Sequence, residues 1–440
     1  MTSSVSAPDS PAGPASARDA RGRWRVAVTG LGVKTPAGCD VKTYWDTMLG
    51  GRSVTGPVTN FDTGTLPVRI ATEVRDFEPL AYLSAKTMRR MDKITQMGFA
   101  AAMDAATDAG EIGTDVDRYG IVFGTGTGGI ETLGDQAIIS ATGGTHLVSP
   151  LLVPMMMPNA TNAFVSIELG WTGPSFAVAS ACASGTTAVG EAAKLIRYGD
   201  CDAVLAGGGE HSVNIYAMSG FIRTGALSAR NDDPTRASRP FDLNRDGYVM
   251  GEGAAFLVLE RLDLALARNA HVYAEVVGYG MNADAYHLTA PRPDGARAAA
   301  CIQRALTDAG LPPEAIGQVN AHGTSTHLND AMEARAIRRV FGAGGPPVTG
   351  SKGVFGHLMG AAGAAESVVS VLSAERGVVP PTANYEDPDP ECDLDVVAGA
   401  PRPIGRKPVL SNSFGFGGHN ACLVFAPFGA DPPGSAATSR

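Results

Sequence analysis

The feature of this sequence that most limits its fold is a phrase that occurs twice. Residues 107–110 read TDAG, and the same four letters return at 307–310, displaced by 200 residues. The strand-like runs that follow also correspond, because YGIVFGTGT (119–127) and VNAHGTST (319–326) share a Gly-Thr pair displaced by 199 residues. Two copies of helix, loop, strand and glycine turn in nearly constant register predict a duplicated α/β unit, not an array of short repeats.

The position of the repeat divides the chain into two halves with a tail at each end. Ordered structure is expected to begin at WRVAVTGLG, a β-branched run closed by glycines. We predict an N-terminal half over 25–270 and a C-terminal half over 271–428. The flanking segments 1–24 and 429–440 are rich in Pro, Ala, Ser and Gly, and we predict that they are disordered.

Composition excludes several classes of function. The 440 residues are 44% hydrophobic, enough for large buried cores, and the net charge of −9 disfavours a general nucleic-acid surface. No apolar run approaches the ~18 residues that span a bilayer. The six cysteines form no CxxC pair, so neither a zinc site nor a disulfide framework is predicted. These features predict a cytoplasmic protein that binds neither membrane nor nucleic acid.

One cysteine stands in an unusual setting. In SACASGTTAVGEAAKLI (180–196), Cys182 lies between a strand-like run and a segment whose apolar Ala188, Ala192 and Ile196 recur at helical spacing. A helix N-terminus carries about half a positive charge, which favours a thiolate over the thiol, whose ordinary pKa is near 8.5. We therefore predict an ionised nucleophile here, and inert buried thiols for the other five cysteines.

Two further patterns suggest sites that we reject. GTGTGG (124–129) fits a dinucleotide-binding fingerprint, but its counterpart in the second repeat lacks the glycines, so a tight turn is favoured over an oxidoreductase site. FDLNRDGYVMGEG (241–253) imitates a calcium loop but has Gly253 where a bidentate glutamate is needed. We predict a structural turn with internal charge pairing and no metal.

Histidines and a lysine in glycine-rich surroundings complete a set of reactive groups. His322 lies in NAHGTSTHLND, and Lys352 and His357 lie in GSKGVFGHLMGAAGAAE. Together with Cys182 and the segment SNSFGFGGHN (411–420), they supply a nucleophile and hydrogen-bond donors for covalent acyl transfer.

These motifs, in this order, resemble the β-ketoacyl-acyl-carrier-protein synthases of the thiolase superfamily. The resemblance rests on ACASG, RPFDLNRDGYVMGEG, NAHGTSTxxND, SKxxxGHxxGAAGAxE and NSFGFGGHN, and it covers about residues 25–428. The intact NSFGFGG ending and the TANYEDPDP segment are more similar to elongating type II fatty-acid synthases than to polyketide ketosynthases. The family fold is a duplicated five-layered α-β-α-β-α sandwich, usually found as a homodimer.

The resemblance implies a mechanism. Cys182 would take an acyl group from the phosphopantetheine arm of acyl carrier protein, and no other cofactor is implied. His322 and His357 would then donate hydrogen bonds during decarboxylation of malonyl-carrier protein, and the resulting carbanion would attack the acyl group in a Claisen condensation. This extends a fatty-acid or polyketide chain by two carbons.

It also assigns supporting roles. Lys352 would orient the histidines and Glu366 would support that network, while the backbone N–H groups of Cys182 and Phe416 form an oxyanion hole that Phe416 also gates. The remaining expected positions are, for the pantetheine arm, Thr324, Thr326 and Thr289; for the acyl pocket, Thr127 and Phe414; and for carrier-protein docking, Lys86, Arg89 and Arg90.

Two residues depart from the family pattern. His327 replaces a common proline and is expected to alter the loop along the pantetheine tunnel. Thr127 stands where elongating enzymes often place an apolar residue, so a more polar or differently shaped acyl chain is expected.

Three alternatives stay open at this point. The chain could be a non-catalytic chain-length partner, although that lineage typically lacks the nucleophile. It could be a thiolase acting on coenzyme A esters, with Cys422 as a second cysteine. It could also work as a heterodimer with a related subunit.

Overall fold

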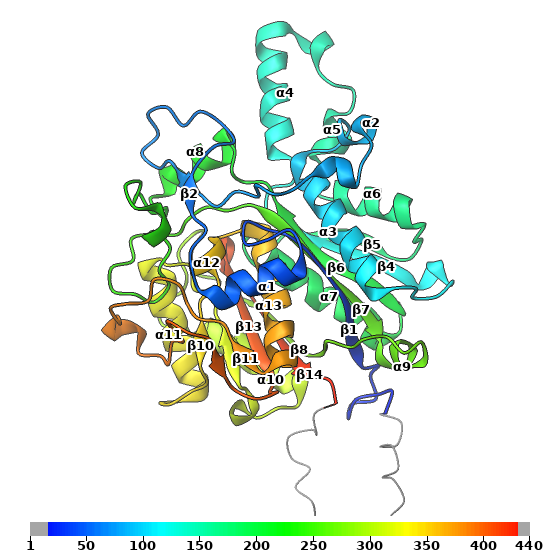
Figure 1. The fold of residues 1–440 in the computed structure, drawn as a ribbon, viewed down its shortest axis with the longest axis vertical. Coiled ribbons are helices and arrows are strands. Elements are labelled where there is room, and N and C mark those ends of the chain that lie inside the picture. Colours follow the sequence, from blue (N-terminus) through cyan, green and yellow to red (C-terminus); the bar gives the residue numbers. More distant parts are fainter. Residues whose placement is uncertain (1–15, 430–440) are drawn as a thin grey trace, which may run out of the picture.

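The computed structural model describes residues 16–429, and its ten main strands form two matching sets of five (Figure 1). The order across the sheet is β10-β9-β13-β14-β8-β1-β7-β6-β4-β5. The strands of the first half are β1 (Val26–Lys34), β4 (Tyr119–Gly124), β5 (Ser175–Val178), β6 (Ala203–Glu210) and β7 (Gly253–Arg261). Those of the second half are β8 (Ala274–Ala283), β9 (Gln318–Asn320), β10 (Val348–Thr349), β13 (Val409–Gly415) and β14 (His419–Pro427).

The two sets share one topology. In the first half β4 runs parallel to β5 and β6, whereas β6, β7 and β1 are antiparallel neighbours. In the second half β9 runs parallel to β10 and β13, and β13, β14 and β8 are antiparallel neighbours. Only two residue pairs join the sets, Ala27 with Glu275 and Val28 with Ala274. The duplication predicted from the repeated phrase is confirmed.

Helices complete a five-layered arrangement. The helices α7 (Ser184–Tyr198) and α13 (Ala362–Arg376) pack together in the middle, and each contacts strands of both sets. The helix α3 (Lys93–Ala109) packs on the strands of the first half, and α10 (Ala296–Ala309) packs on those of the second. The thiolase-like α-β-α-β-α sandwich is therefore confirmed.

The repeated aspartate has the same task in both halves. Asp108 Oδ2 accepts a hydrogen bond from the backbone N–H of Leu31 on β1 at 2.9 Å. Asp308 Oδ2 accepts one from the backbone N–H of Tyr279 on β8 at 3.0 Å. Each carboxylate thus fastens the end of its helix to the strand that the helix covers.

The glycines beside those strand residues let helix and strand approach closely. A Cβ added to Gly30 would lie 2.2 Å from the carbonyl oxygen of Ala105, and one added to Gly278 would lie 2.3 Å from that of Ala305. Both distances are far below van der Waals contact, so only glycine fits at either place.

The prediction of disorder is wrong for the last part of the N-terminal tail. Within residues 16–24, the ring of Trp24 lies 3.6 Å from the guanidinium carbon of Arg261, and Arg23 Nη1 lies 2.5 Å from Asp308. Cation–π contact and ion pairing order this segment, which composition alone does not reveal. The parts of both predicted tails beyond the described residues are not placed by the structure.

The remaining elements surround this core. The other helices are α1 (Val41–Gly50), α2 (Ala85–Met88), α4 (Ile130–Gly143), α5 (Leu152–Met156), α6 (Ala160–Leu169), α8 (Ile215–Thr224), α9 (Leu262–Ala267), α11 (His327–Phe341) and α12 (Lys352–Phe355). Two small two-stranded sheets pair β2 (Gly56–Pro57) with β3 (Ile70–Ala71), and β11 (Val378–Val379) with β12 (Arg402–Pro403). The helix α4 projects from the body (Figure 1), and none of its side chains is fully buried. Among residues 16–429 no helix is both long and apolar enough to cross a membrane.

Candidate active site

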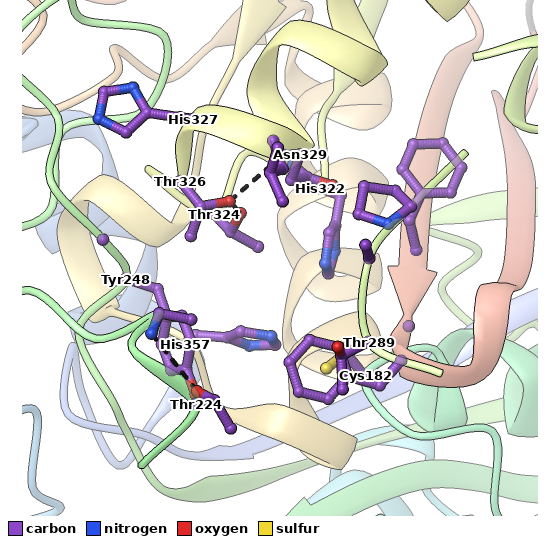
Figure 2. A pocket seen from close by; sticks show the side chains of 18 of the residues that line it. Cys182, Thr224, Tyr248, Thr289, His322, Thr324, Thr326, His327, Asn329 and His357 are labelled. Carbon is purple, nitrogen blue, oxygen red and sulfur yellow. Dashed lines mark hydrogen bonds between the residues drawn. The ribbon is translucent and has the colours of Figure 1, made fainter. Parts of the chain in front are cut away.

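A cavity of about 300 Å³ brings together most of the residues that the sequence singled out. Figure 2 shows the rings of His322 and His357 and the side chain of Cys182 converging on this space. Of the predicted site residues, those that line it are Cys182, Thr289, His322, Thr324, Thr326, His357, Phe414 and Phe416. The cavity lies where the halves meet, since the cysteine belongs to the first and the histidines to the second.

A tight turn presents Cys182 just before α7. Ala181 adopts a left-handed φ of 51°, an arrangement that a small side chain tolerates best. The hydroxyl of Ser184 fastens the turn, because it accepts from the N–H of Ser180 at 2.9 Å and donates to the carbonyl of Ala181 at 2.7 Å. The strand-to-helix turn predicted for this cysteine is therefore present.

The ionised thiolate predicted for Cys182 is not what the environment favours. The sulfur keeps partial access to the cavity, but burial raises the pKa of the Cys182 thiol to about 11. The backbone N–H of Phe416 and the charge of Lys352 lower this pKa, and the carboxylate of Glu210 raises it. Loss of water outweighs the helix N-terminus, so the thiol carries its proton at neutral pH.

Lys352 fixes the protonation of His322. Lys352 Nζ lies 3.2 Å from His322 Nδ1, 2.6 Å from the His322 carbonyl oxygen and 2.5 Å from Glu366 Oε1. An ammonium group only donates, so Nδ1 accepts and the proton of the neutral ring sits on Nε2. Burial and the charge of Lys352 hold the pKa of His322 well below its usual value. His322 is therefore a neutral imidazole with a free N–H donor.

His357 reaches the same state by a different contact. Its Nδ1 accepts from the backbone N–H of Met359 at 3.2 Å, which places the ring proton on Nε2. Burial and then Lys352 lower the pKa of His357 well below its usual value. The two imidazole rings are nearly perpendicular, with centroids 5.4 Å apart. Of the two histidines, only His322 forms a hydrogen bond with Lys352. The expectation that Lys352 orients both histidines is therefore corrected to His322.

Two buried glutamates stand behind the His322 loop, and sequence reasoning found only one of them. Burial raises the pKa of Glu366, the partner of Lys352, to about 7. Glu333 was missed, although it accepts from the backbone N–H of His322 at 2.9 Å and of Gly323 at 2.8 Å. Its place in NDAMEARA, on the inner face of the helix that follows the histidine loop, is the signal that could have identified it.

The threonines predicted to contact pantetheine line one side of the cavity. The hydroxyls of Thr324 and Thr326 lie 2.8 Å apart, and Thr326 also caps α11. Thr289 is exposed at the cavity, and His327, the first residue of α11, is an exposed lining residue. The departure from proline thus places an imidazole beside the path that a pantetheine arm would take.

The two phenylalanines of the SNSFGFGGHN segment occupy different depths. The ring of Phe414 is buried and lies 6.0 Å, centroid to centroid, from that of His322. Phe416 is half-buried and packs against Phe221 at 6.4 Å. Its backbone N–H and that of Cys182 both lower the pKa of the Cys182 thiol. This arrangement suits the expected oxyanion hole and gate.

Thr127 is not among the residues that line the described cavity, and its place in an acyl pocket stays a prediction. Its hydroxyl donates to Glu210 Oε1 at 2.7 Å, and the residue is exposed. The assignment of Thr127 to the acyl pocket came from the family resemblance, which does not show which way this side chain turns.

The three cations predicted for docking lie on or directly after α2. Lys86, Arg89 and Arg90 are all exposed, and none of them forms an ion pair with another residue of the described part of the chain. They form a cluster of positive charge on an otherwise acidic protein.

The rejected patterns have structural explanations. The N–H groups of GTGTGG that would hold a phosphate include Gly126, which donates to Glu210 instead. In the calcium-like loop, Asp242 pairs with Arg239 at 2.9 Å. Cys422 lies buried on β14 and is absent from the cavity lining, where a thiolase would need it.

Comparison with known families decides the relationship. The sequence profile of the β-ketoacyl synthase N-terminal domain matches residues 23–265, and that of the C-terminal domain matches 273–386. The chain belongs to the β-ketoacyl synthase family. The resemblance drawn from the five motifs and the acyltransferase class are thereby confirmed.

Similar proteins span nearly the whole β-ketoacyl synthase chain. A 3-oxoacyl-[acyl-carrier-protein] synthase 2 of Synechocystis sp. is 45% identical over 92% of this chain and 98% of its own length. One from Coxiella burnetii is 43% identical over 91% and 98%. Among solved structures, the ishigamide ketosynthase/chain length factor has a TM-score of 0.86 and 37% identity, covering 92% of this chain and all of its own.

Proposed function

We propose that this β-ketoacyl synthase is an elongating enzyme that condenses an acyl group on Cys182 with malonyl-acyl carrier protein. The observation that carries the proposal is the cavity in which one thiol faces two neutral imidazoles, each with its N–H on Nε2. Neutral N–H donors suit an oxygen on which negative charge develops. The curated relatives, named 3-oxoacyl-[acyl-carrier-protein] synthase 2, support this activity.

The first half-reaction transfers the acyl group. The Cys182 sulfur attacks the thioester carbonyl, the bond to the pantetheine sulfur breaks, and the thiol proton ends on the departing pantetheine thiol. The N–H groups of Cys182 and Phe416 stabilise the oxyanion of the tetrahedral intermediate. Because the resting thiol is protonated, this proton transfer accompanies attack.

The second half-reaction forms the carbon–carbon bond. Malonyl thioester loses CO2, and the electron pair becomes an enolate whose oxygen accepts from Nε2–H of His322 and of His357. The enolate carbon attacks the acyl carbonyl on Cys182, the carbon–sulfur bond breaks, and the thiolate regains a proton from solvent. Lys352 acts by holding His322 in the donor tautomer.

Two substitutions of the nucleophile test this assignment. Cys182→Ala should abolish condensation, and Cys182→Gln, whose amide resembles an acylated cysteine, should also abolish it but retain malonyl decarboxylation. Product and CO2 are measured separately, and Cys39→Ala, at another partly exposed cysteine, serves as the control. Condensation by either Cys182 variant would show that the nucleophile lies elsewhere.

The retained nucleophile also argues against a non-catalytic chain-length partner. Intact-protein mass spectrometry with a panel of acyl-carrier thioesters identifies both loading and chain length. We propose fatty acyl chains as substrates. A preference for oxygenated polyketide chains would contradict this.

Acyl carrier protein is proposed to dock at the α2 cluster. A ketosynthase with a TM-score of 0.84 and 32% identity to this chain was solved in complex with its type II polyketide acyl-carrier protein. Carrier proteins are acidic, and Lys86, Arg89 and Arg90 supply exposed positive charge of matching sign.

A homodimer is proposed as the working form. The strand β5 ends the sheet, and Phe176 and Val178 on it are only partly buried. A hydrophobic, unpaired edge strand is usually covered by a partner. Light scattering on the purified chain tests this, and a monomer that gains activity only with a related subunit would indicate the heterodimer. The cytoplasmic location stays a prediction.

A further inference from the structure

One buried carboxylate, Glu210, joins the two halves beside the active site. Glu210 ends β6 and has no exposed surface. Its two oxygens accept five hydrogen bonds. The donors are Thr125 Oγ1 (3.0 Å), Gly126 N (2.7 Å), Thr127 N (3.1 Å), Thr127 Oγ1 (2.7 Å) and Gly360 N (3.0 Å).

These donors come from both halves of the chain. Four of them belong to the loop after β4, in the half that carries Cys182. The fifth, Gly360 N, follows Met359, whose N–H holds the ring of His357. The Ser184 hydroxyl, which fastens the cysteine turn, shares its proton between the carbonyl oxygens of Ala181 at 2.7 Å and Thr125 at 3.2 Å. Glu210 is therefore bonded both to the surroundings of the nucleophile and to those of a histidine.

The segments around Glu210 are packed so closely that glycine cannot be replaced by a residue with a side chain. A Cβ added to Gly360 would lie 2.5 Å from Gly126 N and 2.6 Å from Glu210 Oε2. One added to Gly185, in the first turn of α7, would lie 2.5 Å from Ala364 N and 3.0 Å from the carbonyl oxygen of Gly360. Glycines thus let the two halves touch here, and the carboxylate satisfies the N–H groups that this contact leaves without partners.

The surroundings of Glu210 define its charge. All five contacting groups can donate, and those from the backbone cannot accept, so the geometry suits an ionised carboxylate. A glycine-rich turn whose N–H groups could cradle a phosphate here cradles an anion of the protein's own chain. Burial raises the pKa of Glu210 and its hydrogen bonds lower it.

We propose that Glu210 is a positioning residue that fixes the His357 loop relative to the Cys182 turn, so that enolate and acyl thioester meet at bonding distance. This inference rests on the proposed condensation. It follows from the contacts, since the nucleophile and the histidines come from different halves and Glu210 bonds to both. A misplacement of about 1 Å between reacting groups can cost ~100-fold in rate.

The experiment compares two rates in the full-length Glu210→Gln enzyme. Glutamine has the same shape, but its NH2 group cannot accept the N–H bonds that a carboxylate oxygen accepts. Condensation needs both halves aligned, whereas malonyl decarboxylation needs the histidines without the thiol. We expect the ratio of condensation to decarboxylation to fall at least tenfold. Thr127→Val, which removes one of the five hydrogen bonds, should lower the ratio in the same direction but less.

A matched control separates positioning from stability. Glu260 is a buried glutamate on β7 that pairs with Arg268 and lies outside the cavity lining. Glu260→Gln should leave the ratio unchanged. An unchanged ratio of condensation to decarboxylation in Glu210→Gln overturns the inference. If that variant does not fold, an unchanged ratio in Thr127→Val overturns it. Failure of the native chain to condense would instead refute the proposed function.

Discussion

Replacing Lys352 by methionine should separate what this residue does for stability from what it does for catalysis. Its side chain is 1% exposed, and its ammonium group lies against Glu366, which has no exposed surface. Methionine keeps the length of the side chain but removes the charge, so Glu366 is left as a buried carboxylate without a cation. Removing one partner of a buried ion pair costs about 3–5 kcal/mol of unfolding free energy.

The loss of unfolding free energy in Lys352→Met should depend on pH in a defined direction. Burial raises the pKa of Glu366 from an ordinary 4.5 to about 7, and Lys352 opposes that rise. A carboxyl group with a raised native pKa binds more protons in the folded state, so its contribution to stability is complete below pH 4.5 and is lost as pH rises through 7. Without Lys352 the pKa of Glu366 rises further and the loss extends above pH 7. Lys352→Met should therefore be more destabilising at pH 8 than at pH 6.

The double variant Lys352→Met, Glu366→Gln provides the decisive comparison. Removing both charges should restore most of the lost stability at pH 8, measured by urea denaturation. Malonyl decarboxylation should stay reduced about 10²- to 10³-fold, because His322 has lost the donor to Nδ1 that keeps its proton on Nε2. If decarboxylation recovers together with stability, Lys352 does not act through the tautomer of His322.

Three further outcomes are expected. Gly30→Ala should lower the melting temperature through overpacking of about 1–3 kcal/mol, because its Cβ meets a backbone oxygen at 2.2 Å, whereas Gly50→Ala, with nothing within 4 Å, should not. Burial lowers the pKa of His211, but ion pairs with Glu131 and Glu252 raise it to about 9. The contribution of His211 to the free energy of unfolding is therefore complete below pH 6.5 and is lost as pH rises through 9. His211→Gln should flatten that part of the profile of unfolding free energy against pH, and an unchanged slope would contradict the ion pairing. Replacing Lys86, Arg89 and Arg90 by glutamate should raise KM for carrier-bound acyl groups several-fold without changing kcat for a carrier-free thioester. Equal effects on the carrier-bound and carrier-free substrates would place docking elsewhere.

The repeated phrase was enough to predict the duplicated architecture because its residues make the same contact in both halves, so the same letters recur at the same place in each copy. Asp108 and Asp308 each bond to a strand that their own helix covers, and glycines mark the close approach. The turn at Cys182 was also predictable, since small residues and helical periodicity surround it in the chain.

Properties that depend on distant segments were not predictable from the sequence. The pKa of Cys182 is set by how much water the other half excludes, and the helix N-terminus is the only contribution visible locally. Glu210 carries no motif of its own, and its hydrogen-bond partners lie 83 to 150 residues away. The direction of Thr127 depends on Glu210, so its side chain could not be placed before that carboxylate was known.

The matching strand order of the halves has a consequence for which catalytic group each half supplies. Cys182 lies just before α7, and His357 lies in the segment between α12 and α13, five residues before α13 begins. Corresponding regions of the two halves therefore provide a sulfur nucleophile in one copy and an N–H hydrogen-bond donor in the other. The chemistry arises from breaking the symmetry of two like scaffolds that face each other across a shared cavity.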